Sequence, residues 1–169
     1  MKILETKNLI LRQVSPDDAQ FILALLNDPA FIRNIGDRGV RTLDNARNYI
    51  RNRLVASYEK FGFGMYLAIL KDSGDATGLC GLVKRDGLDD VDIGYAFLPQ
   101  YRSKGYATES ALAVKEYAKS VIRLKRLVAI TDPANQGSIR VLKKIGLEFE
   151  KMVRLSEDDI ELKLYAINF

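Results

Sequence analysis

The order of strand-like and helix-like segments along this chain leaves few folds open. Alternating or continuous apolar runs predict strands, and such runs cover 8–14, 65–70, 78–84, 91–97, 127–131, 147–155 and 160–167. Apolar residues at helical spacing predict helices that cover roughly 15–26, 42–58, 105–122 and 136–144. A chain of this order forms a sheet with helices on its faces, not a bundle or a sandwich. We therefore expect one α/β domain over 1–169, with a mixed seven-stranded sheet and about four helices.

Local signals support these boundaries. Ser15 and Pro16 are typical of a helix start, and Asp18 occupies the capping-box position. The segment 72–75 (DSGD) predicts a hairpin turn. The stretch 31–41 contains two glycines and three arginines and predicts an irregular loop.

The chain has no histidine and a single cysteine, Cys80. Nucleophilic triads that use an imidazole, histidine-containing zinc centres and internal disulfides are thereby excluded. Any chemistry must use carboxylates, hydroxyls, phenols, lysine or backbone amides. Cys80 lies between Leu79 and Gly81 in a strand, so we expect it to pack in the core.

Hydropathy and charge indicate where the protein is located and which partners it can bind. No apolar run approaches the roughly 20 residues that span a bilayer, and the N-terminal segment has no continuous apolar core of an export signal. We expect a cytoplasmic protein without a membrane partner. The 26 basic and 22 acidic residues leave a net charge of +4. The segment 100–126 alone carries seven basic residues and two acids, which favours a localised anion site over a diffuse DNA-binding surface.

The segment between the strand 91–97 and the helix 105–122 carries the clearest chemical signal. It reads QYRSKGYAT over 100–108. A strand that leads through a basic, glycine-containing loop into a helix presents free N–H groups and the positive end of the helix dipole to a phosphate. Taken alone, the pattern is equally compatible with a solvated turn. It matches neither the P-loop nor the dinucleotide fingerprint.

These residues resemble a known signature. Arg102, Gly105 and Ala107 match [QR]-x-x-G-x-[GA], the acetyl-CoA pyrophosphate signature of the GNAT N-acetyltransferase superfamily. Asn135-x-x-Ser138 and the following segment 142–147 (LKKIGL) are similar to a second signature, found in the branch that contains ribosomal-protein alanine N-acetyltransferases. Segments 9–12, 37–42 and 78–83 also read as that branch, so the likeness covers nearly the whole chain. The resemblance implies a mostly antiparallel sheet, acetyl-CoA as cosubstrate and no metal.

The resemblance also implies the residues that contact the cosubstrate. A backbone N–H near Phe97 would meet the acetyl oxygen, and the loop would hold the pyrophosphate. Asn135 would bind the pantetheine amides, unless it only caps a helix. The expected cosubstrate residues are Phe97, Arg102, Ser103, Lys104, Gly105, Tyr106, Ala107, Thr108, Asn135 and Ser138.

An acetyl acceptor needs a base more than the leaving group needs an acid. An ammonium group must lose its proton before it attacks, whereas a thiol with a pKa near 8.5 leaves readily. Asp90, Asp92 and Gly94 share one side of their strand by the two-residue period. Relatives often carry an acid at the position of Asp92, so we expect Asp92 to act as the base through a water molecule. The alternative is that both acids are merely solvated at the start of a strand.

Two further positions concern catalysis and helix stability. Many relatives place a tyrosine near the thioester sulfur, but this chain has Leu142 at that position. Ser138 is then the closest match for a group that meets the departing thiol, or it has a capping or packing role. Glu109 in the first turn of its helix suits the helix dipole.

The acceptor is left open by the sequence. Arg33, Arg38 and Arg41 lie where relatives line the mouth of the acceptor site, and we expect Arg38 and Arg41 to contact the substrate unless the loop is only solvated. The function indicated is acetyl-CoA-dependent acetylation of a primary amine, with a peptide or ribosomal-protein N-terminus as the acceptor. The alternatives are a polyamine, amino acid or antibiotic acceptor, or a non-catalytic acyl-CoA-binding module. A monomer or a homodimer is expected, and an exposed final strand could pair with a second copy.

Overall fold

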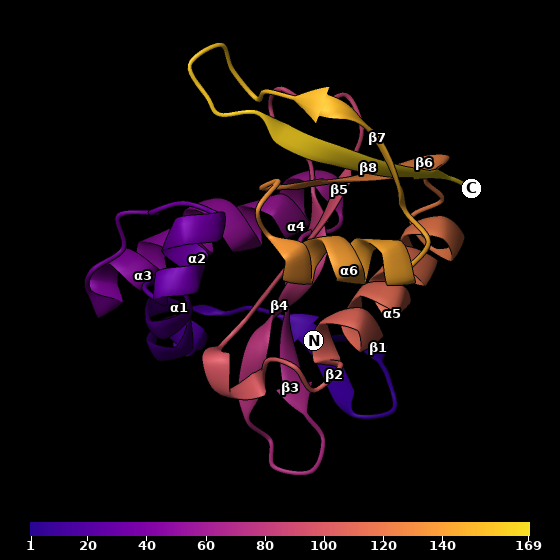
Figure 1. Ribbon diagram of the computed structural model, residues 1–169. Helices are drawn as coiled ribbons and strands as arrows, with labels where there is room; N and C mark the ends of the chain where they lie inside the picture. The colour runs from indigo at the N-terminus through magenta and orange to yellow at the C-terminus, as the bar shows by residue number, and fades with distance from the viewer.

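One mixed sheet carries every strand in the computed structural model, which describes all residues from 1 to 169 (Figure 1). Its strands are β1 (Lys2–Glu5), β2 (Leu9–Gln13), β3 (Met65–Leu70), β4 (Ala76–Val83), β5 (Asp92–Phe97), β6 (Arg126–Thr131), β7 (Glu148–Val153) and β8 (Leu162–Asn168). They lie in the order β1-β2-β3-β4-β5-β6-β8-β7. All neighbours are antiparallel except β5 and β6. The expected mixed, mostly antiparallel α/β sheet is confirmed.

The sheet has eight strands, not the seven that the sequence predicts. The additional strand is β1, which pairs with β2 through contacts such as Leu4 with Leu11. It is only four residues long, with Lys2 and Glu5 at its ends, so it leaves just two apolar residues to signal a strand. Pairing with its neighbour, and not its own hydropathy pattern, makes this segment a strand.

The last strand is not an edge. β8 lies between β6 and β7, and both its sides are hydrogen-bonded. The expectation that the final strand is free to pair with a second copy is therefore wrong. The free edge at this end of the sheet belongs to β7, because β8 returns antiparallel into the space beside β6.

The helices are α1 (Ala19–Leu26), α2 (Pro29–Asn34), α3 (Leu43–Tyr49), α4 (Ala56–Phe61), α5 (Tyr106–Ser120) and α6 (Gln136–Lys144). A π-helical turn, η2 (Ile50–Val55), joins α3 and α4 into one continuous helical rod, so the helical bodies number five instead of about four. The unexpected body is α2, which overlaps the start of the stretch 31–41 for which the sequence predicts a loop. Asp28 caps it by accepting a hydrogen bond from the N–H of Phe31, and Pro29 occupies its first turn. Only Asn27 thus separates the end of α1 from the residue that caps α2.

Helices cover both faces of the sheet and enclose two apolar clusters. On one face α5 and α6 pack on residues such as Tyr66, Leu82 and Phe97. On the other face α1, α2, α3 and the turn η2 pack on Leu67 and Leu79. Figure 1 shows α1, α2 and α3 grouped at the left and α5 with α6 towards the right. No helix combines the length and the apolar character that crossing a membrane requires.

Candidate functional site

The sheet opens between β5 and β6. These two parallel strands share one residue pair, Asp92 with Val128, whose N–H donates to the Val91 carbonyl. Beyond that pair β5 follows β4 alone. Leu98 donates to Thr77, so the alternation of an antiparallel ladder turns the N–H groups of Tyr95 and Phe97 away from β4. Both donors therefore face the opening.

The loop at the end of β5 presents a row of free donors. None of the six N–H groups from Ser103 to Thr108 donates to an acceptor in the protein. The backbone turns sharply there, because Ser103 and Gly105 both have left-handed conformations, with φ of 60° and 85°. Gly105 then leads directly into α5. Successive N–H groups at a helix start form an anion-binding concavity, and Lys104, which makes no ion pair, adds a full charge.

The side chain of Arg102 has two partners within the protein. Its Nε donates to the carbonyl oxygen of Phe97 at 3.0 Å, and its terminal nitrogen forms an ion pair with Asp28. Asp28 is buried and caps α2. The arginine thus ties the start of the loop to β5 and to a helix on the opposite face.

Ser138 and Asn135 lie at the start of α6. The Tyr95 hydroxyl is 3.0 Å from both the carbonyl oxygen and Oγ of Ser138, which joins β5 to α6 across the opening. Asn135 accepts a hydrogen bond from the N–H of Ser138 and therefore caps the helix, as its alternative reading predicts. Burial raises the pKa of Tyr95, so its hydroxyl keeps its proton and can donate.

Asp92 lies at the opposite end of β5 from Phe97, about 16 Å away along the strand at 3.3 Å per residue. Its side chain is 1% exposed. Arg85 Nε donates to Oδ2 at 2.8 Å, whereas Oδ1 has no partner. Burial raises the pKa of Asp92, and the nearby Arg85 charge opposes that rise. Asp92 is therefore an acid with one buried oxygen available to accept a proton.

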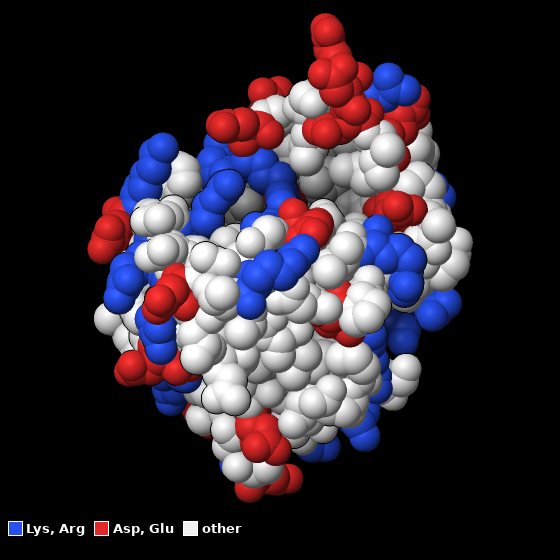
Figure 2. Space-filling model, turned by 90° about the vertical axis from the view of Figure 1, so that its left-hand side faces the viewer, with Lys and Arg blue, Asp and Glu red and all other residues white.

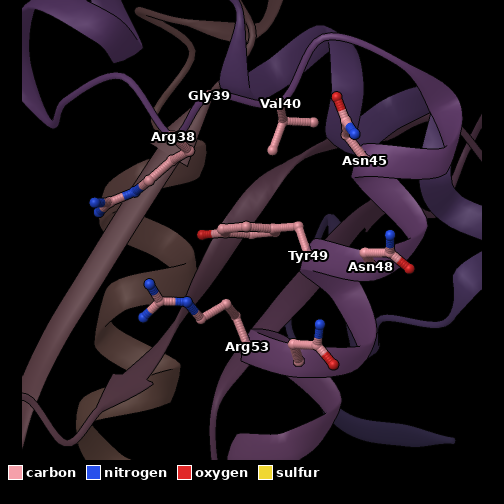
Figure 3. A pocket seen from close by; sticks show the side chains of 8 residues that line it. Arg38, Gly39, Val40, Asn45, Asn48, Tyr49 and Arg53 are labelled. Atoms are coloured by element: carbon pink, nitrogen blue, oxygen red, sulfur yellow. The ribbon is translucent and has the colours of Figure 1, made fainter.

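A pocket of about 280 Å³ lies in the helical layer on one face of the sheet, between the loop before α3 and the helical segment formed by α3 and η2. The loop before α3 supplies Arg38, and the helix supplies Tyr49 and Arg53. Figure 3 shows these three side chains extending in the same direction, with the Tyr49 hydroxyl between the two guanidinium groups. Neither arginine forms an ion pair. The pocket can hold an anion.

The structure separates the two arginines expected to contact the substrate. Arg38 lines the pocket, whereas Arg41 does not. Arg41 forms an ion pair with Asp37 at 2.5 Å and donates to Asn27 Oδ1 at 3.0 Å. Arg41 therefore stabilises the loop before α3.

Two other residues have structural contacts. Glu109 accepts hydrogen bonds from Thr6 Oγ1 and from Asn8, so it anchors α5 to the turn between β1 and β2. Cys80 is fully buried, and burial raises its pKa to about 12.

No group of three or more histidine, cysteine or acidic side chains is placed to hold a metal ion.

Sequence reasoning missed Tyr49, Arg53 and Tyr95. A usable signal existed for the first two: Asn45, Asn48, Tyr49, Asn52 and Arg53 all line the pocket. Their spacing of three, one, three and one residues is that of a single helix face. A polar stripe on a helix is usually solvated, so the pattern alone does not indicate a pocket. Tyr95 has no sequence signal, because its partner Ser138 is 43 residues away.

The chain is similar to known proteins in both sequence and fold. The family described as "Acetyltransferase (GNAT) domain" matches residues 8–148. An uncharacterized N-acetyltransferase, YnaD from Bacillus subtilis, is 33% identical over 147 residues, which are 87% of this chain and 83% of that protein. The structure of a GNAT-family acetyltransferase from Bacillus anthracis is 26% identical, with a TM-score of 0.81 over 99% of this chain and 98% of that one.

A third neighbour is informative about the fold. It is the structure of RimL, a ribosomal L7/L12 alpha-N-protein acetyltransferase in complex with coenzyme A. The TM-score is 0.83 and the identity 16%, over 99% of this chain and 98% of that one. The whole of the present chain therefore adopts the architecture of a coenzyme A-binding protein.

Proposed function

Because the chain belongs to the GNAT family of acetyl-CoA-dependent N-acetyltransferases, we propose that its acceptor is a primary amine at the N-terminus of a peptide or ribosomal protein. The observation that carries the acetyl-CoA site is the row of six free N–H groups between Ser103 and Thr108, at the end of the strand where the sheet opens. The likeness of the fold to RimL supports the choice of acceptor.

Two parts of the site would bind different parts of acetyl-CoA. The loop 103–108 would bind the pyrophosphate, and the opening between β5 and β6 would bind the acetyl group. The amides of Ser103 to Thr108, with Lys104, fit a pyrophosphate, because they offer free donors and positive charge without a competing acidic partner. The N–H of Phe97 faces the opening and suits the acetyl oxygen. Bound acetyl-CoA supplies an activated thioester, which a neutral amine can attack directly.

Asp92 is proposed as the base that receives the ammonium proton, which a chain of water molecules would carry along β5 over the roughly 16 Å between Phe97 and Asp92. Its unpartnered Oδ1 offers the accepting atom, and Arg85 keeps the carboxylate oriented. Asp92, Gly94 and Ala96 face the side of the sheet that carries the pocket, whereas Ser138 lies on the side of α5 and α6. In this proposal Asp92 accepts the proton on one side of the sheet, and Ser138 meets the leaving thiol on the other side.

Ser138 is proposed to meet the departing sulfur. Its hydroxyl lies beside the Tyr95 hydroxyl, whose raised pKa favours the protonated form. The pair can donate a hydrogen bond to a thiolate without a histidine in the site. Asn135 holds the first turn of α6 in place and so positions Ser138.

Thiol release and mass spectrometry with synthetic peptides test the acceptor. Peptides with a free N-terminus and no lysine should gain one acetyl group, while the same peptides with a blocked N-terminus should not react. Acetylation of polyamines or antibiotic amines in preference to all free N-termini would contradict the peptide assignment and leave acetyl transfer intact.

A further inference from the structure

The segment 31–53 forms a second basic region, distinct from the loop after β5. It contains six arginines and two aspartates and therefore has a net charge of 6 − 2 = +4. The aspartates are already used, because Asp37 pairs with Arg41 and Asp44 with Arg47. Arg33, Arg38, Arg51 and Arg53 have no carboxylate partner. Figure 2, which views this side of the molecule, shows basic side chains gathered around a hollow.

Two of these free arginines, Arg38 and Arg53, converge on the pocket, with the Tyr49 hydroxyl between them (Figure 3). Guanidinium groups that face the same space repel each other unless an anion lies between them. No lysine occurs between Lys7 and Lys60. The planar guanidinium binds a carboxylate through two parallel hydrogen bonds, which a lysine cannot do.

The pocket and the strand that bears the proposed base border the same apolar cluster, on which Tyr49 and Ala96 both pack. Tyr49 and Met65 pack on the same apolar cluster beneath α3. A Cβ at Gly94 would lie 3.6 Å from Met65 Sδ, so Met65 borders β5 two residues from Asp92. A molecule in the pocket therefore lies on the side of the sheet to which Asp92 points.

We infer that the acetyl acceptor carries a carboxylate, which Arg38, Arg53 and Tyr49 bind while its amine faces β5. This inference rests on the proposed acetyl transfer and specifies its substrate class. At about 280 Å³ the pocket is slightly smaller than the roughly 300–1,000 Å³ that hold whole small-molecule ligands. It suits one acidic side chain near the N-terminus of a peptide, and it disfavours a polyamine, whose charges are positive.

The test compares two peptides that share an N-terminal residue and differ only in Glu against Gln at the next positions. The wild-type enzyme should acetylate the Glu peptide with a kcat/KM about tenfold or more higher. Arg38→Ala and Arg53→Ala should each bring that ratio towards one, and Arg53→Lys should restore part of it. Arg51→Ala is the matched control, because Arg51 is exposed on the same helical turn, has no ion pair and does not line the pocket.

Three results overturn the inference: equal rates for both peptides in the wild type, a preference for polyamines, or a Glu preference that survives both alanine variants. A second comparison uses free glutamate and free glutamine as acceptors in place of the two peptides. An arginine-dependent preference seen only with the free amino acid supports the carboxylate site and contradicts the peptide acceptor.

Failure of acetyl transfer itself is distinguished by binding. The acetylated Glu peptide cannot react, yet it should raise the melting temperature of the wild type and of Arg51→Ala, but not of Arg38→Ala or Arg53→Ala. If no amine is acetylated and this binding is present, the anion site stands and the proposed function fails. If this binding is absent, the inference is wrong.

Discussion

Arg102 and Asp28 form an ion pair that links the loop after β5 to the N-terminus of α2. Asp28→Ala removes the helix cap and the partner of Arg102 together. We expect a loss of about 1–2 kcal/mol in the free energy of unfolding, since a cap contributes about 1 kcal/mol and a partly exposed pair less than that. Asp28→Asn should lose clearly less, because asparagine caps equally well. Urea unfolding measures both variants.

The same pair predicts a coupling in acetyl-CoA binding. Asp28→Asn and Arg102→Ala should each weaken binding, because each loosens the loop that presents the free N–H groups. Their double mutant should lose less than the sum of the two. Calorimetry provides the three values, and strictly additive losses would show that the ion pair does not act on the loop.

Gly105 can be tested against a glycine of the same geometry. A Cβ at Gly105 would meet no atom within 4 Å, so the cost of Gly105→Val arises from its φ of 85° rather than from crowding within the protein. We expect a loss of about 1–3 kcal/mol in stability and weaker acetyl-CoA binding, because the neighbouring N–H groups turn away.

Gly74→Val is the matched control, since Gly74 has a φ of 77° and equally open space in the turn between β3 and β4. It should lower stability by a similar amount and leave the dissociation constant for acetyl-CoA unchanged. Equal effects of both variants on binding would remove the loop from the site.

The proposed role of Asp92 as the base predicts a specific dependence of the acetylation rate on pH. Burial raises its pKa, so the acid limb of kcat/KM should lie above the ordinary carboxyl value of about 3.9. Asp92→Asn should lower turnover most at low pH, where few amines lose their proton unaided. Arg85→Ala removes the charge that opposes the rise and should move the limb to higher pH. Identical pH profiles in all three proteins would rule out Asp92 as the base.

The raised pKa also has a consequence for stability. A buried acid that prefers its proton disfavours folding when ionised, so the cost is absent below the ordinary carboxyl pKa and complete above the raised one. The stability of the wild type relative to Asp92→Asn should therefore fall as the pH rises through that interval. Chemical unfolding at a series of pH values measures it, and a rising difference would mean that Arg85 outweighs burial.

Variants of Ser138 and Tyr95 distinguish an effect on the catalytic rate from an effect on the stability of the fold. Ser138→Ala removes the hydroxyl but keeps the carbonyl to which Tyr95 donates, so it should lower kcat about tenfold with little change in unfolding. Tyr95→Phe removes both contacts and should also cost about 1 kcal/mol of stability. An unchanged kcat in Ser138→Ala would leave Ser138 a purely structural residue.

The sequence predicted the strands and helices that carry their own apolar pattern and missed those that depend on neighbours. The helix expected over roughly 136–144 is confirmed, because Asn135 caps it and its apolar residues Ile139 and Leu142 are buried. β1 depends on β2, and α2 depends on the cap at Asp28 more than on any periodicity.

The candidate site follows the same division. The loop 103–108 is encoded locally, so its free amides could be anticipated from the chain alone. The partners of Arg102 and Tyr95 lie 74 and 43 residues away and depend on how the helices pack on the sheet. In the second basic region the sequence singles out Arg38 but not Arg53, because Arg53 reaches the pocket only through the packing of the loop before α3 against the helix.

The π-helical turn η2 begins directly after Tyr49 and contains Arg53, and both residues line the pocket. Such a turn holds one residue more than α-helical winding needs. Deleting one residue from it would return the segment to α-helical winding and would change the position of Arg53 relative to Tyr49. The loop 103–108 would be untouched. In evolution, the loss of a single codon in this helix would thus alter the pocket while the free N–H groups of the loop are inherited intact.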